Sequence, residues 1–391
     1  MPWKTTNKEE QRYELVRQMR SDVAPVSELC REFRISRQTA YRWRRRFQAK
    51  RLAGLKDRSH RPARVFGRTG RLWLDRLRRL RKKRPTWGAR KLRHRLGQRF
   101  GRTGVPAVAT LSRWLKRWGL ASGGRRRKPG PVVIRRAVRV SRHCNEVWTV
   151  DFKGWYRTGD GTRVDPLTVR DLHSRYGLKI GLLASQSVAS TQREMARIFR
   201  QHGLPERIRC DNGPPFGGGG PTGLTRLSAW WVKLGIKVEF MTPGRPCENG
   251  AHEQFHRVYK AEVARYPVKD LTGQQRRSTE WLHDYNHERP HEALGMKVPA
   301  QCYRKSPRQL PTRITPWIYA RTWERRWVKG NGEISWHGIR RFVGEAFVRD
   351  YVGLKPVRRG VWEVYFGPVL VGELREDESG GIRLAKYRHQ K

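Results

Sequence analysis

Three acidic residues occupy positions at which a carboxylate could take part in chemistry. Asp151 lies in an apolar run at residues 147–152, Asp211 follows a shorter run at residues 207–210, and Glu253 lies in a segment with helical spacing. Carboxylates on two neighbouring strands and on an adjacent helix could surround two divalent cations, as metal-assisted phosphoryl transfer requires. Hard oxygen ligands favour Mg²⁺, for which Mn²⁺ could substitute. If they converge, these three acids could therefore form a catalytic site that binds two Mg²⁺ ions.

Each acid also has an ordinary interpretation. A carboxylate in an apolar strand is costly unless it has a partner, and Asp151 could simply pair with one of the many arginines or lysines. Asp211-Asn212-Gly213 could be no more than a tight turn. Glu253 could form a surface ion pair with Arg257 one helical turn away. The metal site therefore depends on the three acids converging.

A mixed sheet covered by helices would position these acids. Residues 147–152, 164–169, 176–183, 207–210 and 237–241 have the composition of strands, and residues 191–202, 224–234 and 249–266 have that of helices. Three strands followed by alternating helix and strand predict a mixed sheet. Asp211 would lie at the carboxyl end of its strand, where ligands usually bind in such sheets. The glycine-rich residues 213–223 predict a mobile loop beside it.

The charge of the chain indicates a polyanionic partner. Its 391 residues include 86 Lys and Arg against 34 Asp and Glu, a formal net charge of +52. Codon bias could exchange lysine for arginine, but it would not explain the shortage of acids, so nucleic acid is the expected partner. Five scattered cysteines without a C-x-x-C pair predict neither a disulfide framework nor a zinc site. The N-terminal residues do not resemble a signal peptide, and no apolar run is long enough to cross a membrane. We therefore expect a cytoplasmic, nucleoid-associated protein.

Two helical units precede the predicted sheet. Near residue 36, Ser36 could cap a helix in which Ala40, Trp43 and Phe47 share one face. The side chains off that face predict a helix that reads the major groove of DNA, although a small bundle with a solvated basic face would look similar; they are Arg37, Gln38, Thr39, Tyr41 and Arg42. A second three-helix pattern carries apolar residues between residues 74 and 118, and a Gly-, Pro- and Arg-rich linker follows.

The C-terminal segment changes to short β-rich runs between residues 333 and 374, separated by glycine and charge. These runs predict a small β-barrel. It could be a structural cap or a basic module that holds DNA, and the sequence favours neither.

An ordered series of motifs spans almost the whole chain. It consists of Trp87-Gly88-Ala89-Arg90-Lys91-Leu92, Trp148-Thr149-Val150-Asp151-Phe152, DLHSRY at 171–176, Asp211-Asn212-Gly213, Arg245-Pro246 with Glu248-Asn249-Gly250, EQFHRVYK at 253–260 and YNHERPHEAL at 285–294. The series resembles the integrase-core transposases of bacterial insertion sequences, which are relatives of retroviral integrases. The resemblance implies an Asp–Asp–Glu site of Asp151, Asp211 and Glu253 on a ribonuclease-H-like core.

The resemblance also implies contacts with DNA. His256 and Lys260 match positions that face the DNA end in relatives. Glu253, His256, Arg257 and Lys260 fall on one helical face, so Arg257 is also predicted to bind DNA. Tyr285, Asn286, Arg289 and His291 match a family signature with a structural or DNA-contacting role. Two features depart from the retroviral pattern: a longer interval from Asp211 to Glu253, and helix-turn-helix units in place of an N-terminal zinc module. Glu248 is a rival for the third acid.

The predicted organisation is multidomain, with all-α modules, an α/β core and a β-barrel. The expected bounds are 1–60 and 68–120 for the helix-turn-helix modules, 121–141 for the linker, 142–305 for the core and 315–391 for the barrel. The predicted activity is Mg²⁺-dependent cleavage and strand transfer at the terminal inverted repeats of an insertion sequence, by a homo-oligomer on double-stranded DNA. The alternatives are an inactive DNA-binding regulator derived from such a protein and a structure-specific nuclease.

Overall fold

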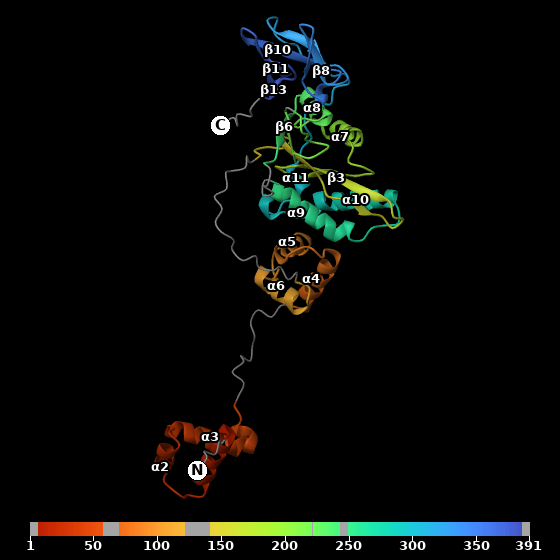
Figure 1. The fold of residues 1–391 in the computed structure, drawn as a ribbon. Coiled ribbons are helices and arrows are strands. Elements are labelled where there is room, and N and C mark those ends of the chain that lie inside the picture. Colours follow the sequence, from red (N-terminus) through yellow and green to blue (C-terminus); the bar gives the residue numbers. More distant parts are fainter. Residues whose placement is uncertain (1–6, 58–69, 122–140, 221, 243–248, 385–391) are drawn as a thin grey trace. The chain divides into compact units, whose positions relative to one another are not determined.

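The computed structural model describes the chain except for residues 1–6, 58–69, 122–140, 221, 243–248 and 385–391 (Figure 1). The predicted linker and the motif pieces Arg245-Pro246 and Glu248 lie outside the described residues. The chain forms two compact units, Met1–Arg68 and Thr69–Lys391, and each is described by itself.

The first unit is a small helical bundle. It contains α1 (Lys8–Arg20), α2 (Val26–Glu32), α3 (Arg37–Lys50) and the 3₁₀ turn η1 (Arg51–Leu55). The side chain of Ser36 accepts a hydrogen bond from the backbone N–H of Thr39 and so caps α3, which confirms the predicted start of this helix. Ala40, Trp43 and Phe47 are buried together in the core of the bundle, as their spacing predicts.

The second unit begins with a further three-helix module. It consists of α4 (Arg71–Lys83), α5 (Ala89–Phe100) and α6 (Val108–Arg117). Its core combines apolar residues of all three helices with one tryptophan from the α4–α5 loop; they are Leu77, Trp87, Leu92, Leu96, Leu111 and Leu115. We refer to this three-helix part as the second module.

A mixed sheet follows, as predicted. Its strands are β1 (Val147–Phe152), β2 (Tyr156–Arg157), β3 (Arg163–Asp171), β4 (Gly177–Leu183), β5 (Arg207–Cys210) and β6 (Lys237–Phe240). The order is β2-β3-β1-β5-β6, with β4 also paired to β3. The first hairpins are antiparallel, whereas β1, β5 and β6 run parallel to one another.

Helices pack on the sheet through two separate apolar clusters. One cluster joins the sheet to α7 (Val188–His202) and α8 (Arg226–Lys233). The other joins it to α9 (Gly250–Tyr259), the π turn η3 (Lys260–Ala264) and α10 (Leu271–His287). The short helices η4 (Glu292–Leu294) and α11 (Pro299–Cys302) follow α10. The sheet therefore lies between two groups of helices. Glu253 lies on α9, which belongs to the group formed with η3 and α10.

The C-terminal strands form an open sheet, so the described residues do not show the predicted closed barrel. The elements are β7 (Glu324–Trp327), β8 (Glu333–Trp336), β9 (Ile339–Phe342), η5 (Glu345–Phe347), β10 (Tyr351–Arg358), β11 (Val361–Phe366), β12 (Val369–Arg375) and β13 (Arg383–Leu384). Five strands pair in the order β13-β12-β11-β10-β7, and β8-β9 is a separate hairpin. Leu224, Ala229 and Val232, from and beside α8, pack into the core of this domain. The helix thus covers apolar surface that closure of a barrel would otherwise have to bury.

Among the described residues, no helix has the length and apolar character needed to cross a membrane.

Candidate metal centre

The parallel pairing of β1 and β5 brings two of the predicted acids to the same place. Val147 is opposite Arg207 and Thr149 is opposite Arg209. Continuing this register by two residues places Asp151 beside Asp211, where the two strands approach their carboxyl ends. Ligand sites in α/β sheets usually lie at these ends.

Asp151 is largely buried, with its side chain 25% exposed. Burial, together with the negative charges of Asp211 and Glu253, raises the pKa of Asp151 to about 7. One of its carboxylate oxygens, Oδ2, accepts a hydrogen bond of 3.3 Å from the side-chain amide of Asn249. The charges of both other acids therefore act on Asp151, but the carboxylate oxygens of Asp151, Asp211 and Glu253 do not all lie within 4.8 Å of one another.

Asp211 leaves a polar atom without a partner. Burial raises its pKa, while the backbone of Gly213 has the opposite effect. Its Oδ1 atom is buried and accepts no hydrogen bond from the described residues. A buried carboxylate oxygen without a donor is costly. A cation beside it would remove that cost, so the donor set fits a hard divalent ion.

Glu253 lies on the exposed side of α9. The predicted alternative, an ion pair with Arg257, does not form between these two described residues. Within the described part of the chain, no arginine or lysine forms an ion pair with Asp151, Asp211 or Glu253. The competing interpretation, in which each acid is neutralised by its own cation, is therefore not supported.

Two buried histidines adjoin Asp151, and neither of them was predicted at this position from the sequence. Ligand atoms of Asp151, His252 and His256 all lie within 4.8 Å of one another. His256 Nδ1 is 3.8 Å from Asp151 Oδ2. Burial, with the positive charges of Lys153 and Arg170, lowers the pKa of His256 to about 3, so the ring is neutral near pH 7. The contact is therefore polar rather than an ion pair.

A threonine hydroxyl connects both histidines to the backbone of Asp151. Thr168 Oγ1 donates to the carbonyl oxygen of Asp151 at 2.9 Å. The hydroxyl oxygen of Thr168 also lies 2.6 Å from His252 Nε2 and 2.7 Å from His256 Nε2. His252 Nδ1 in turn lies 2.8 Å from Thr149 Oγ1. This buried network fixes the part of β1 that carries Asp151. The i, i+4 spacing of the two histidines was a visible sign of it in the sequence.

The basic residues predicted beside Glu253 divide into two groups. Arg257 and Lys260 are exposed on α9 and η3, where DNA could reach them. His256 is only 8% exposed and is directed into the histidine–threonine network. Its position supports Asp151 rather than a contact with a DNA surface.

In the first unit, the predicted DNA-reading residues lie around the start of α3. Arg37, Gln38, Tyr41 and Arg42 are exposed, and Thr39 is half-buried with its hydroxyl 2.9 Å from that of Ser36. Arg42 lies over the ring of Trp43 at 5.8 Å. The face opposite the buried core is therefore available to a polyanion.

Of the four family-signature residues, Tyr285, Asn286 and Arg289 are buried and make contacts within the protein. The side chain of Asn286 accepts from the backbone N–H of Gly177 at 2.9 Å and donates to its carbonyl oxygen at 2.8 Å. Tyr285 packs edge-to-face on Phe255, with ring centroids 4.9 Å apart. Arg289 and the Nε2 atom of His291 are also buried. These contacts hold α10 against β4 and α9.

Models of known families match four parts of the chain. A helix-turn-helix domain matches residues 11–63, and a homeodomain-like domain matches residues 39–115. An integrase core domain matches residues 234–299, and the C-terminal domain of the IS481 family transposases matches residues 324–377. The integrase match contains Glu253 and both histidines.

Two relatives are proteins of bacterial insertion elements. The chain is 28% identical over 184 residues to the IS407 uncharacterized 31.7 kDa protein of Burkholderia multivorans, over 47% of this chain and 64% of that protein. It is 29% identical over 180 residues to the IS476 uncharacterized 39.2 kDa protein of Xanthomonas euvesicatoria, over 45% of this chain and 49% of that protein. The chain thus spans about half to two thirds of the length of these relatives.

Solved structures of retroviral integrases resemble the chain weakly. The HTLV-2 integrase catalytic core domain, solved with magnesium, has a TM-score of 0.34 at 16% identity and covers 42% of this chain and 99% of its own. A simian T-cell lymphotropic virus intasome has a TM-score of 0.38 at 15% identity and covers 76% of this chain and 98% of its own.

Proposed function

Because the chain is a relative of the insertion-sequence transposases that carry an integrase-type catalytic core, we propose that it cuts DNA at the ends of such an element and joins them to target DNA. Residues 1–60 and 68–120 would bind the terminal inverted repeats, and residues 121–141 would link them to a core at 142–305. Residues 315–391 would form a C-terminal domain, whose barrel closure stays a prediction. Two element ends must be held together, so a homo-oligomer on double-stranded DNA is expected.

Asp151, Asp211 and Glu253 would hold the metal. Their donors are all carboxylate oxygens, one of which is buried without a partner, and this set suits two Mg²⁺ ions, or Mn²⁺ in their place. When bound, such ions activate an attacking oxygen and stabilise the leaving oxygen in phosphoryl transfer. Glu253 is preferred to Glu248 because it lies within α9, three residues after Gly250, and shares a helical face with Lys260.

The other residues of the site would orient and bind. Asn249 and Thr168 fix the side chain and backbone of Asp151, and the neutral histidines hold Thr168 in place. Lys260 and Arg257, exposed on the helix that carries Glu253, would contact phosphates of the DNA end. Positive charge there would also stabilise the negative charge that develops during transfer.

One observation carries this proposal: the negative charges of Asp211 and Glu253 both act on the buried Asp151, and no described arginine or lysine forms an ion pair with any of the three acids. The test is an Asp151→Asn variant on labelled double-stranded DNA that carries the element's end, with Mg²⁺ or Mn²⁺. We expect end binding to be retained and cleavage and joining to be lost by at least about 10³-fold. Asp377→Asn, an exposed acid of the C-terminal domain, is the matched control and should keep full activity.

Two outcomes would contradict the proposal. Cleavage by Asp151→Asn at the parental rate would remove the role of this carboxylate. A parental protein that binds the end but never nicks it with either metal would be a DNA-binding regulator instead.

A further inference from the structure

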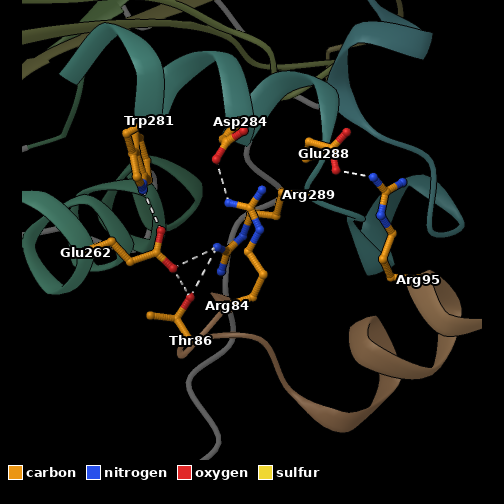
Figure 2. Close-up of polar contacts among 8 residues, drawn as sticks. All are labelled: Arg84, Thr86, Arg95, Glu262, Trp281, Asp284, Glu288 and Arg289. Atoms are coloured by element: carbon orange, nitrogen blue, oxygen red, sulfur yellow. Dashed lines mark hydrogen bonds and ion pairs between the residues drawn. The ribbon is translucent and has the colours of Figure 1, made fainter. Parts of the chain in front are cut away.

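A row of acids on the core faces arginines of the second module. Arg84 Nη1 is 2.6 Å from Asp284 Oδ2. Arg95 forms an ion pair with Glu288 (Figure 2), and Arg90 Nη1 is 2.9 Å from Glu292 Oε2. All three arginines belong to the segment from the end of α4 through α5, and all three acids belong to the end of α10 and the turn η4 that follows.

The centre of this contact is a buried polar cluster around Glu262. Its carboxylate accepts hydrogen bonds from the hydroxyl of Thr86 and from Nε1 of Trp281, and lies 3.4 Å from Arg289 Nη1 (Figure 2). Arg289 Nη1 also donates to Thr86 Oγ1 at 3.2 Å. The side chains of Glu262 and Arg289 are only 16% and 7% exposed. Removing one partner of a buried, hydrogen-bonded charge leaves the other uncompensated, so this centre should be sensitive to substitution.

The module side of the contact is itself held in shape. Arg81 Nη1 donates to the carbonyl oxygen of Trp87 at 2.6 Å, and the Trp87 ring is buried in the module core. Arg84 lies over that ring at 5.5 Å. The loop that carries Arg84 and Thr86 is therefore held in one conformation by its contacts with the module core.

The contact leaves the third helix of the module available. Ser112, Arg113 and Lys116 are exposed on α6, and none of them takes part in the ion pairs with the core formed by the described residues. Arg84, Arg90 and Arg95, in contrast, each form an ion pair with an acid of the core. In a chain with only 34 acids and a net charge of +52, four of the acids serve this one contact.

We propose that these residues form a docking clamp that fixes the second module on the catalytic core, so that α6 meets DNA at a set distance from Asp151, Asp211 and Glu253. The clamp consists of Arg84, Thr86, Arg90 and Arg95 on the module and Glu262, Asp284, Glu288, Arg289 and Glu292 on the core. Its members are positioning residues, and the DNA part of this inference rests on the proposed function. The motifs at residues 87–92 and 285–294 are then two halves of one interface.

Charge exchange across the Arg95–Glu288 pair tests docking without DNA. Hydrogen–deuterium exchange of the full chain would be followed at residues 84–95 and 285–294. Arg95→Glu and Glu288→Arg should each accelerate exchange there about tenfold, the factor that about 1.4 kcal/mol of lost protection produces. The double variant should restore the parental rate. Arg113→Glu, on the exposed face of α6, is the matched control and should leave this exchange unchanged.

The same variants then separate docking from DNA affinity. Glu288→Arg adds positive charge, so a purely electrostatic role would strengthen DNA binding and leave the cleavage position unaltered. The clamp predicts instead that Glu288→Arg shifts or scatters the cleavage position at a labelled end, and that the added Arg95→Glu substitution restores it.

The hydrogen–deuterium exchange result and the DNA cleavage result are independent of each other. Unchanged exchange in both single variants, or no recovery in the double variant, would overturn the clamp. A parental chain that does not cleave at all would contradict the proposed function, while the exchange result would still decide whether the module is docked. If a single variant fails to fold, recovery in the double variant decides the same question.

Discussion

At the scale of single residues, the site depends on how Asp151 is supported. Its position follows from the strand register with Asp211, but its orientation follows from Thr168, Asn249 and two neutral histidines. The sequence predicted the three acids from the position of Asp151 in an apolar strand, the position of Asp211 at a strand end and the family motifs around Glu253. It did not place His252 or His256 beside them, because the direction in which a helix presents its side chains depends on what that helix packs against.

Thr168→Val should weaken metal use without removing any carboxylate. Valine keeps the shape of threonine but leaves the Nε2 atoms of His252 and His256 without their shared partner. We expect a loss of stability of about 1–3 kcal/mol and a rise in the Mg²⁺ concentration needed for half-maximal cleavage. Thr279→Val, whose hydroxyl bonds only within α10, is the control. Unchanged metal dependence in Thr168→Val would show that the network has no influence on the site.

At the scale of elements, α10 does more than cover the sheet. One part of it packs on β4 and α9 through Asn286 and Tyr285, and its end meets the second module. The strands and helices of the core were predictable because each has its own apolar period. The open C-terminal sheet was not, because alternation specifies strands but not whether the two edge strands will pair.

The buried ammonium group of Lys91, in the second module, lowers the stability of the folded chain near pH 7, and this effect can be measured. Burial, together with the positive charge of Arg289, lowers its pKa from 10.5 to about 8. The unfolded chain therefore binds this proton more tightly, and stability should rise as pH increases from about 8 to 10.5. Lys91→Met should raise the melting temperature at pH 7 by about 2–4 °C and remove this part of the pH dependence.

Thermal unfolding of the full chain between pH 7 and 10.5 measures both effects. Lys116→Met, an exposed lysine of the same module, is the matched control and should alter neither. A Lys91→Met variant less stable than the parent at pH 7 would mean that the ammonium group stabilises the contact.

At the scale of the whole molecule, some basic residues form ion pairs within the protein and others are exposed to solvent. Arg84, Arg90 and Arg95 form the ion pairs of the clamp, whereas Arg37, Arg42 and Arg113 are exposed on helices proposed to meet DNA. The net charge of +52 therefore overstates the number of side chains that can contact DNA.

DNA affinity should fall steeply with salt, because each phosphate contact releases counterions. For about 6–10 contacts, affinity is lost by about 10³–10⁵-fold between 50 and 200 mM salt. Arg113→Glu should reduce the slope of log affinity against log salt, since it removes a contact predicted for α6. Fluorescence anisotropy with a duplex of the element's end measures the slope, and a flat salt response would contradict the electrostatic basis of binding.

The sequence by itself determined which residues are acidic, which segments are strands or helices, and that the partner is a polyanion. These three properties follow from composition or from the local spacing of apolar residues, and both are present in the chain before it folds. The tertiary structure alone decided that His256 lies inward, that the C-terminal sheet stays open in the described residues, and that Arg84 meets Asp284. The contact between Arg84 and Asp284 joins side chains 200 residues apart in the sequence. No local sequence pattern predicts such a contact, because it forms only when two separately folded surfaces pack together.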